Sequence, residues 1–220
     1  MDPIEQLLEN NRKWAARTTA ADPTFFDTLS RQQAPQYLWI GCSDIRVPAN
    51  QIVGLMPGEV FVHRNVANVV VHADLNCLSV IHYAVEVLKV RHVIVCGHHG
   101  CGGVDAVMRD LRVGLVDNWL RHVRDVQEKH RELVLSVADK PTRRDLLCEL
   151  NVIEQCVNVC ATTVVQDAWA RGQELSVTGL IYGLKDGIIH DLDFRADALG
   201  SVDAAYLAAV STLRSRHWTP

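Results

Sequence analysis

The sequence predicts an α/β fold with a mainly parallel central β-sheet, an antiparallel edge strand, flanking helices and an N-terminal helical arm. Apolar runs at 37–40 and 92–96 each stop at a glycine and have the uninterrupted apolar character of strands buried in a parallel sheet. Segments of helical periodicity separate these runs. An Asp-Gly pair at 186–187, between two further apolar runs, indicates a β-hairpin.

The elements follow one another in a simple order. Asp2, Pro3 and Glu5 form a helix start signal, and the apolar stripe that follows packs either on its own domain or across a partner subunit. The next predicted elements are the strands at 37–40 and 60–63, a helix over 74–90 that is apolar on nearly every side, the strand at 92–96, and helices over 114–130 and 142–171. Strands at 176–182 and 188–194 then flank the hairpin turn, and a helix covers 198–213. Without a repeat or linker, we expect a single domain over 1–220 with an arm over about 1–34.

The composition is that of a globular protein and excludes some classes of partner. Of the 220 residues, 48% are hydrophobic, and 22 Lys and Arg against 26 Asp and Glu give a net charge of −4. Because there is no basic surplus, we expect no nucleic-acid partner, and the apolar runs are too short to cross a membrane. The first residues are acidic where a secretion signal would be basic, so we expect a cytoplasmic protein.

The chain has seven cysteines, an odd number that argues against a disulfide framework in such a compartment. Most lie in helical patterns, where cysteine usually acts as a small hydrophobe. Cys42 and Cys101 differ, because each lies in a glycine-containing loop directly after a predicted strand. If these two strands are neighbours, Cys42, His98 and Cys101 converge at one point, as two thiolates and an imidazole suited to zinc with a fourth position left open.

Three other interpretations of these loops stay open on spacing alone. The glycine-rich segment 97–103 has the position of a phosphate-binding loop, although it fits neither common nucleotide fingerprint. A structural zinc site would need a fourth cysteine or histidine nearby, and the nearby acid is Asp44. His99 is also able to replace His98 as the imidazole ligand.

The combined motif resembles the signature of the β-class carbonic anhydrases, and looks closest to their bacterial branch. Cys42-Ser-Asp44-Ile-Arg46 is followed by His98-x-x-Cys101-Gly-Gly, and the similarity extends over about residues 30–195. The resemblance implies a lyase (carbonate dehydratase) with one Zn²⁺ per chain, which reversibly hydrates carbon dioxide to bicarbonate and a proton by attack of zinc-bound hydroxide. It implies Cys42, His98 and Cys101 as zinc ligands.

The resemblance also implies roles for the residues around the zinc. Asp44 is the catalytic carboxylate, and Arg46 can clamp it with two hydrogen bonds. Asp44 is in addition a fourth metal ligand in a closed state without a nucleophile. The implied assembly is a homodimer, or a tetramer built as a dimer of dimers, with the arm over its neighbour. The implied carbon dioxide pocket consists of Gln33, Phe61, Val66, Tyr83 and Gly102, with Phe61, Val66 and Tyr83 supplied across the dimer interface.

Regulation is a further implication of the resemblance. In one branch of the family bicarbonate stabilises the closed state by binding beside a Trp-Arg-Tyr triad, and this chain has Trp39, Arg64 and Tyr182 at the matching places. Without the resemblance, Trp39 would be interpreted as a core residue and Arg64 as part of a salt bridge. Two other functions stay open: hydrolysis of carbon disulfide or carbonyl sulfide by the same fold, and a thiol-redox or metal-sensing protein.

Overall fold

The computed structural model describes residues 2–31, 34–44 and 46–217. By its internal contacts the chain divides into two compact units, Met1–Ala34 and Pro35–Pro220. A single domain over 1–220 therefore stays a prediction. Among the described residues, no helix is both long enough and apolar enough to span a membrane.

The first unit contains two helices, α1 (Pro3–Ala21) and α2 (Phe25–Arg31). The predicted start signal is confirmed: the Asp2 side chain accepts a hydrogen bond from the Ile4 amide at 3.1 Å, and the Glu5 side chain accepts one from the Asp2 amide at 3.3 Å. No residue of α1 is buried, and its apolar stripe stays exposed, with Leu7 at 62%. The helix is therefore amphipathic, with an apolar face that is largely exposed in its own unit, where Phe26 of α2 packs against Trp14.

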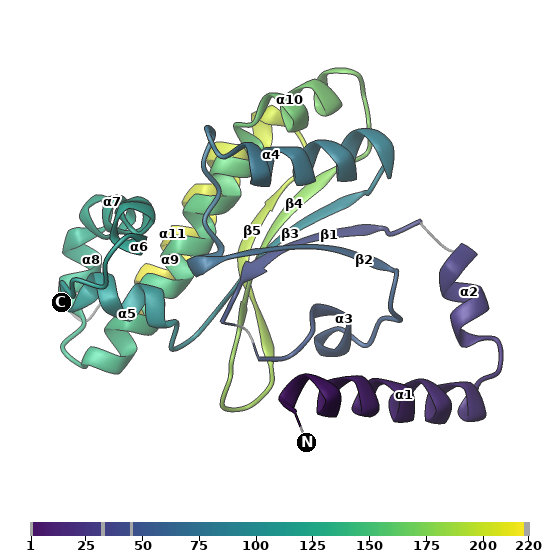
Figure 1. The fold of residues 1–220 in the computed structure, drawn as a ribbon. Helices are drawn as coiled ribbons and strands as arrows, with labels where there is room; N and C mark the ends of the chain where they lie inside the picture. The colour runs from purple at the N-terminus through teal and green to yellow at the C-terminus, as the bar shows by residue number, and fades with distance from the viewer. Residues whose placement is uncertain (1, 32–33, 45, 218–220) are drawn as a thin grey trace. The chain divides into compact units, whose positions relative to one another are not determined.

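The second unit contains a five-stranded sheet with the order β2-β1-β3-β4-β5 (Figure 1). The strands β1, β2, β3 and β4 pair in parallel and β5 pairs antiparallel to β4, which confirms the predicted fold class. The chain runs from β1 outward to β2 and then returns to β3 on the other side of β1. The strands are β1 (Tyr37–Cys42), β2 (Val60–Asn65), β3 (His92–His98), β4 (Ser176–Tyr182) and β5 (Ile189–Ala196).

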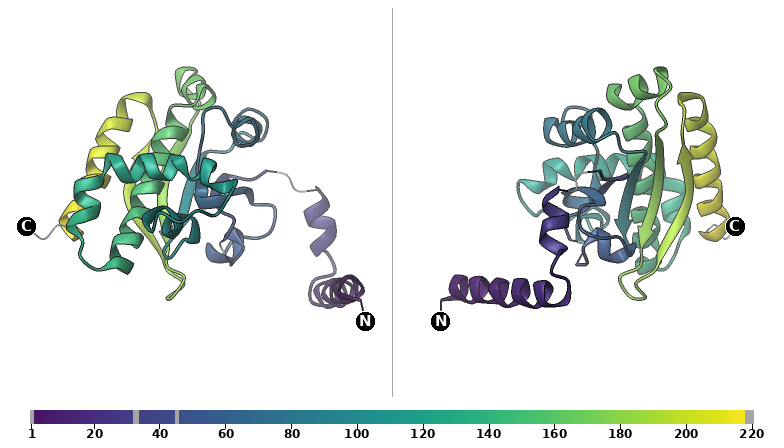
Figure 2. Two further views of the ribbon diagram at one scale, coloured as in Figure 1. Left: turned by 60° about the vertical axis from the view of Figure 1, so that its left-hand side comes forward. Right: turned by 90° about the vertical axis from the view of Figure 1, so that its right-hand side faces the viewer.

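Some helices pack against this sheet, and others pack against those helices. α9 contacts β3 and β4 as well as α11, and Figure 2 shows α11 running alongside β5. The segments α5, α7 and α8 contact α9 in turn. The helical segments are α3 (Ala49–Ile52), η1 (Val66–Asn68), α4 (Leu75–His82), η2 (Tyr83–Val87), α5 (Gly102–Met108), α6 (Val116–Trp119), α7 (Arg121–Lys129), α8 (Arg131–Ser136), α9 (Lys140–Cys160), α10 (Thr163–Ala170), η3 (Leu199–Ser201) and α11 (Val202–His217).

Two predicted helices are each divided in the structure. The prediction of one helix over 142–171 is wrong, because α9 ends at Cys160 and α10 begins at Thr163. Thr162 explains the break: its hydroxyl donates to the Val159 carbonyl at 2.8 Å and accepts from the Val165 amide, so it caps a new helix. The predicted helix over 114–130 likewise divides into α6 and α7 at Leu120.

The close packing of β3 against α9 gives a stability prediction. A Cβ atom at Gly97 would lie 2.6 Å from Val152 Cγ2, and 3.2 Å from both Asn68 Oδ1 and Ile181 Cδ1. We therefore expect Gly97→Ala to lower the free energy of unfolding of the metal-free protein by about 1–3 kcal/mol, measured by urea denaturation. Gly200→Ala is the matched control, because its Cβ would meet nothing within 4 Å. Equal stability of the two variants would contradict this account of the packing.

Candidate metal centre

The carboxyl ends of β1 and β3 lie side by side and carry the predicted ligands. β1 pairs with β3 in parallel, with Gly41 opposite Cys96, so β1 ends at Cys42 beside the end of β3 at His98. Cys101 follows one short turn later, as the residue before α5. The ligand atoms of Cys42, His98 and Cys101 all lie within 4.8 Å of one another, and each residue is at most 2% exposed. The condition that the sequence left open, adjacency of the two strands, is met.

The atoms of this cluster have the spacing that a tetrahedral zinc ion requires. Cys42 Sγ and Cys101 Sγ are 3.8 Å apart. Two thiolates bound to one tetrahedral zinc at about 2.3 Å would be separated by about 3.8 Å as well. The ring of His98 is held by its Nδ1–H, which donates to the His99 carbonyl at 3.0 Å, while its Nε2 is buried without a hydrogen-bond partner among the described residues. The donor set therefore fits zinc, with a lone pair of His98 left for the metal.

The three side chains polarise one another. A hydrogen bond from Cys101 lowers the pKa of the Cys42 thiol to about 4 against the opposing effect of burial. The same bond, together with burial, raises the pKa of Cys101. Burial lowers the pKa of His98, but the nearby Cys42 thiolate outweighs burial and the net shift is upward. Cys42 is thus the more acidic of the two thiols, and a bound cation would replace the proton between the two sulfur atoms.

His99, the alternative imidazole ligand, points elsewhere. Its Nε2 lies 3.0 Å from Glu149 Oε1, and this hydrogen bond is the main cause that raises the pKa of His99. The cluster of metal-type residues includes His98 and not His99. Of the two histidines, His98 is therefore the one placed to bind the ion.

Asp44 and Arg46 form an ion pair next to this cluster. Arg46 Nη2 lies 3.6 Å from Asp44 Oδ1, longer than a charge-assisted hydrogen bond, and both side chains are exposed. The Asp44 amide donates to Cys42 Sγ at 3.4 Å, so the backbone of the loop is tied to the thiolate. The Asp44 carboxylate lies outside the cluster formed by the three other residues. In this structure it contacts Arg46 and is not a fourth member of the metal site.

The predicted pocket residues fall into two groups: Gln33 with Gly102, and Phe61 with Val66 and Tyr83. Gln33 lies outside the described residues. Gly102 directly follows Cys101 and has open space where a Cβ would be. Phe61 on β2 and Tyr83 on η2 pack against each other with tilted rings, whose centroids are 5.8 Å apart. Tyr83 is 43% exposed and Val66 38% exposed, so this apolar group lies at the surface of the chain.

Trp39, Arg64 and Tyr182 come from three strands on the same sheet. Trp39 and Tyr182 belong to one small buried cluster. The Trp39 indole N–H is buried and finds no acceptor in the part of the chain that the structure describes, and a Cβ at Gly41 would come within 2.8 Å of that nitrogen. Arg64 lies opposite Gly41 in the β1–β2 register and donates to the Val47 carbonyl at 3.3 Å.

Polar side chains of α9 support the site and were not predicted. The Gly100 amide, in the loop between His98 and Cys101, donates to Asp145 Oδ1 at 2.9 Å. Glu149 holds His99, as described above, and Asn151 donates to the Ala67 carbonyl at 2.8 Å, where Ala67 has a positive φ of 63°. These residues look like ordinary polar positions of a helix in the sequence. Only their contacts with the segment 99–100 and with Ala67 distinguish them.

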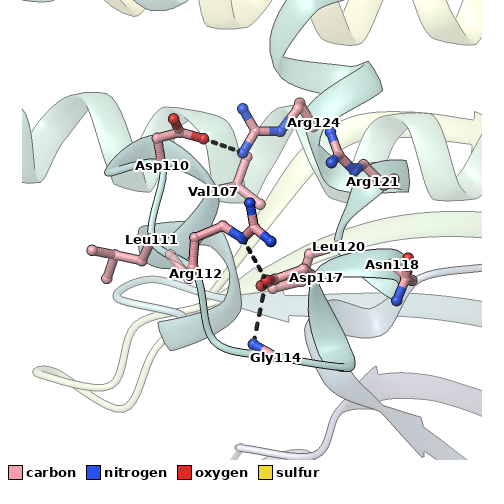
Figure 3. Close-up of a pocket in the computed structure, with 11 residues that line it drawn as sticks. Val107, Asp110, Leu111, Arg112, Gly114, Asp117, Asn118, Leu120, Arg121 and Arg124 are labelled. Carbon is pink, nitrogen blue, oxygen red and sulfur yellow. Dashed lines mark hydrogen bonds and ion pairs between the residues drawn. The ribbon is translucent and has the colours of Figure 1, made fainter.

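A separate cavity of about 270 Å³ lies among α5, α6, α7 and the segment between α5 and α6 (Figure 3). None of the predicted site residues that the structure describes lines it. Two of its three arginines are neutralised, since Arg124 pairs with Asp110 at 2.7 Å and Arg112 with Asp117 at 3.7 Å. The charged side chains that line the cavity thus largely neutralise one another.

Comparison with known proteins gives a consistent result. The model of the family described as carbonic anhydrase matches residues 37–189. A carbonic anhydrase of Emericella nidulans is 49% identical over 86% of this chain and 83% of that relative, and one of Pseudomonas aeruginosa is 34% identical over 86% of this chain and 88% of that relative.

Solved structures agree with this result. The Coccomyxa β-carbonic anhydrase in complex with acetazolamide superposes with a TM-score of 0.84 at 40% identity, and covers 93% of this chain and 92% of its own. One of two tetrameric β-carbonic anhydrases of Sordaria macrospora has a TM-score of 0.84 at 37% identity, over 89% of this chain and 100% of its own. With its Cys-His-Cys cluster at the ends of two parallel strands, the chain belongs to the β-carbonic anhydrase family.

Proposed function

We propose that this protein is a zinc-dependent carbonic anhydrase that reversibly hydrates carbon dioxide to bicarbonate and a proton. The observation that carries the proposal is the buried cluster of Cys42, His98 and Cys101, with its sulfur atoms 3.8 Å apart and an unpartnered His98 Nε2. Beside it lies a carboxylate, Asp44, that is exposed and paired with Arg46. This combination provides three metal ligands and one polar group able to contact a substrate.

The metal ligands, Asp44 and Arg46 have separate roles in the proposed reaction. Cys42, His98 and Cys101 hold one zinc, which when bound activates water as a nucleophile at neutral pH. Asp44 accepts a hydrogen bond from the attacking oxygen and so orients it toward the carbon of the substrate. Arg46 faces Asp44 Oδ1 and leaves Oδ2 for this contact.

The carbon dioxide pocket is proposed to form between two copies of the chain. Carbon dioxide is apolar, and Gln33 and Gly102 are proposed to lie on one chain with Phe61, Val66 and Tyr83 on its partner. The exposure of Val66 and Tyr83 at the surface supports a role for them beside a second chain. The exposed stripe of α1 supports an arm that lies over that neighbour. We propose a homodimer or a tetramer, the latter being the state named for the Sordaria macrospora relatives.

Regulation by pH and bicarbonate is a further part of the proposal. Asp44 would leave Arg46 and become the fourth ligand, which closes the site, and bicarbonate would favour that state from a site at Trp39, Arg64 and Tyr182. The buried Trp39 N–H without an acceptor supports an anion there, because such a donor is costly to leave unpaired. Membership of the bacterial branch and a cytoplasmic location are also part of the proposal. The relatives described above include fungal as well as bacterial proteins.

The metal ligands give the most direct prediction. Dialysed protein should hold about one tightly bound zinc per chain, and Cys42→Ser, His98→Gln or Cys101→Ser should each lose it, since three ligands are few enough for each to be needed. Zinc is measured by metal mass spectrometry. Cys160→Ser is the control, a buried cysteine outside the cluster that should keep its zinc. Full zinc retention in one of the ligand variants would remove that residue from the set.

The ion pair of Asp44 with Arg46 gives a kinetic prediction. Arg46→Ala should keep the fold and the zinc but lower kcat by about 10²-fold, because a carboxylate displaced by about 1 Å orients the nucleophile poorly. Stopped-flow carbon dioxide hydration at several pH values measures this. Arg109→Ala removes a comparable exposed ion pair, to Asp105, and should leave kcat unchanged. Wild-type rates in Arg46→Ala at alkaline pH would show that the pair has no catalytic role.

The pH profile tests the regulatory part. Hydroxide, which competes with Asp44 for the fourth ligand position, becomes scarce as pH falls, so wild-type activity should drop steeply below about neutral pH. Trp39→Phe should make this drop shallower and weaken inhibition by bicarbonate. Trp169→Phe is the control, because the Trp169 N–H already donates to the Leu175 carbonyl at 2.8 Å. Identical shallow titrations in wild type and Trp39→Phe would contradict regulation through the site at Trp39.

A further inference from the structure

A second group of metal-type side chains lies away from the proposed catalytic cluster. It consists of His63 on β2, Asp74 as the residue before α4, and Cys77 in the first turn of α4. One ligand atom of each residue lies within 4.8 Å of those of the other two. His63 is 5% exposed and Cys77 is fully buried, whereas Asp74 is half-buried. We propose that these three residues form a second, weaker site for a divalent cation of the zinc or cobalt class.

The chemistry of the three donors identifies the kind of ion. Thiolate and imidazole favour zinc and cobalt, whereas magnesium and calcium prefer oxygen ligands throughout. One thiolate and one carboxylate together cancel the charge of a divalent cation. An ion bound here would therefore leave no net charge in a site that is largely buried.

The contacts within the group leave room for an ion. Among the described residues, no hydrogen bond or ion pair joins these three side chains to one another, and the Cys77 thiol has no hydrogen-bond partner. Asp74 uses Oδ1 to cap α4 by accepting from the Asn76 amide at 3.0 Å, so Oδ2 is left for a cation. His63 Nε2 faces the Asn65 amide at 3.3 Å, and an ion bound at this nitrogen would exchange that long contact for a metal–nitrogen bond.

The arrangement repeats one feature of the first cluster. Asp74 and Cys77 are three residues apart at a helix start, and His98 and Cys101 are three residues apart before another. In each case a ligand from a neighbouring strand completes the set, Cys42 on β1 and His63 on β2. Ligands on a tetrahedral ion lie about 3.3–3.8 Å apart, and the half-buried Asp74 side chain can adjust its position to meet this spacing. With one thiolate instead of two, it should bind more weakly than the first.

Cobalt titration of the full chain tests this proposal. Metal-free protein is titrated with Co²⁺ without oxygen, and bound metal is counted after desalting while thiolate-to-cobalt absorption is followed in the near ultraviolet. Wild type should bind a first equivalent tightly and a second more weakly. Cys42→Ser should lose the first and keep the second, whereas Cys77→Ala should keep the first and lose the second. If wild type fails to bind the first equivalent tightly but still binds the second, the proposed catalytic cluster is contradicted and the second site is not.

Two further variants separate metal binding from folding. Asp74→Asn keeps the helix cap, because asparagine caps as well as aspartate, but should weaken the second equivalent at least about 10-fold. Cys160→Ala, a buried cysteine outside both groups, should bind like wild type. Circular dichroism confirms that each variant is folded. A wild-type count that stops at one equivalent, or an unchanged second equivalent in Cys77→Ala and Asp74→Asn, would overturn the proposal.

Discussion

The parallel pairing of β1 with β3 is the constraint on which the rest of the site depends. Cys42 and His98 are far apart in the sequence, and only a lateral pairing of their strands brings both to the same edge of the sheet. A shift of this register by one residue would turn one ligand to the opposite face of the sheet. The packing of α9 against β3 and β4 holds the register, and Gly97 allows that helix to approach closely.

A buried group of two thiols and an imidazole is costly unless something compensates it. Part of the compensation is internal, because Cys42 and Cys101 share a hydrogen bond between their sulfur atoms. Part comes from the backbone, since the His99 carbonyl accepts from His98 and the Asp44 amide donates to Cys42. What is left over is the unpartnered His98 Nε2, and a cation is the partner that would satisfy it together with both sulfur atoms.

The strands and the convergence of Cys42, His98 and Cys101 could be predicted from the sequence, because both depend on local patterns. An apolar run stopped by a glycine predicts a buried strand, and a ligand that directly follows it must lie at the strand end. The supporting side chains of α9, such as Asp145 and Asn151, could not be predicted, because their role arises only from packing against distant loops. The break at Thr162 was missed for a different reason: a threonine within an apolar helical pattern is common, and its capping hydrogen bond is visible only in three dimensions.

The group of His63, Asp74 and Cys77 was also beyond sequence analysis, since a lone histidine on a strand and a lone cysteine on a helix look like core residues. Its position ties it to the first cluster through Asn65. Asn65 contacts His63, lies opposite Cys42 in the β1–β2 register, and its carbonyl accepts from the Ser43 amide at 2.8 Å. An ion bound at Nε2 of His63 would take the place of the Asn65 amide. Because Asn65 also holds the Val69 backbone through both atoms of its amide, the effect would be felt in the segment that carries Val66 and Ala67, beside the first cluster. Occupancy of the second group would thus bear on the geometry of the first through one asparagine, without any shared ligand.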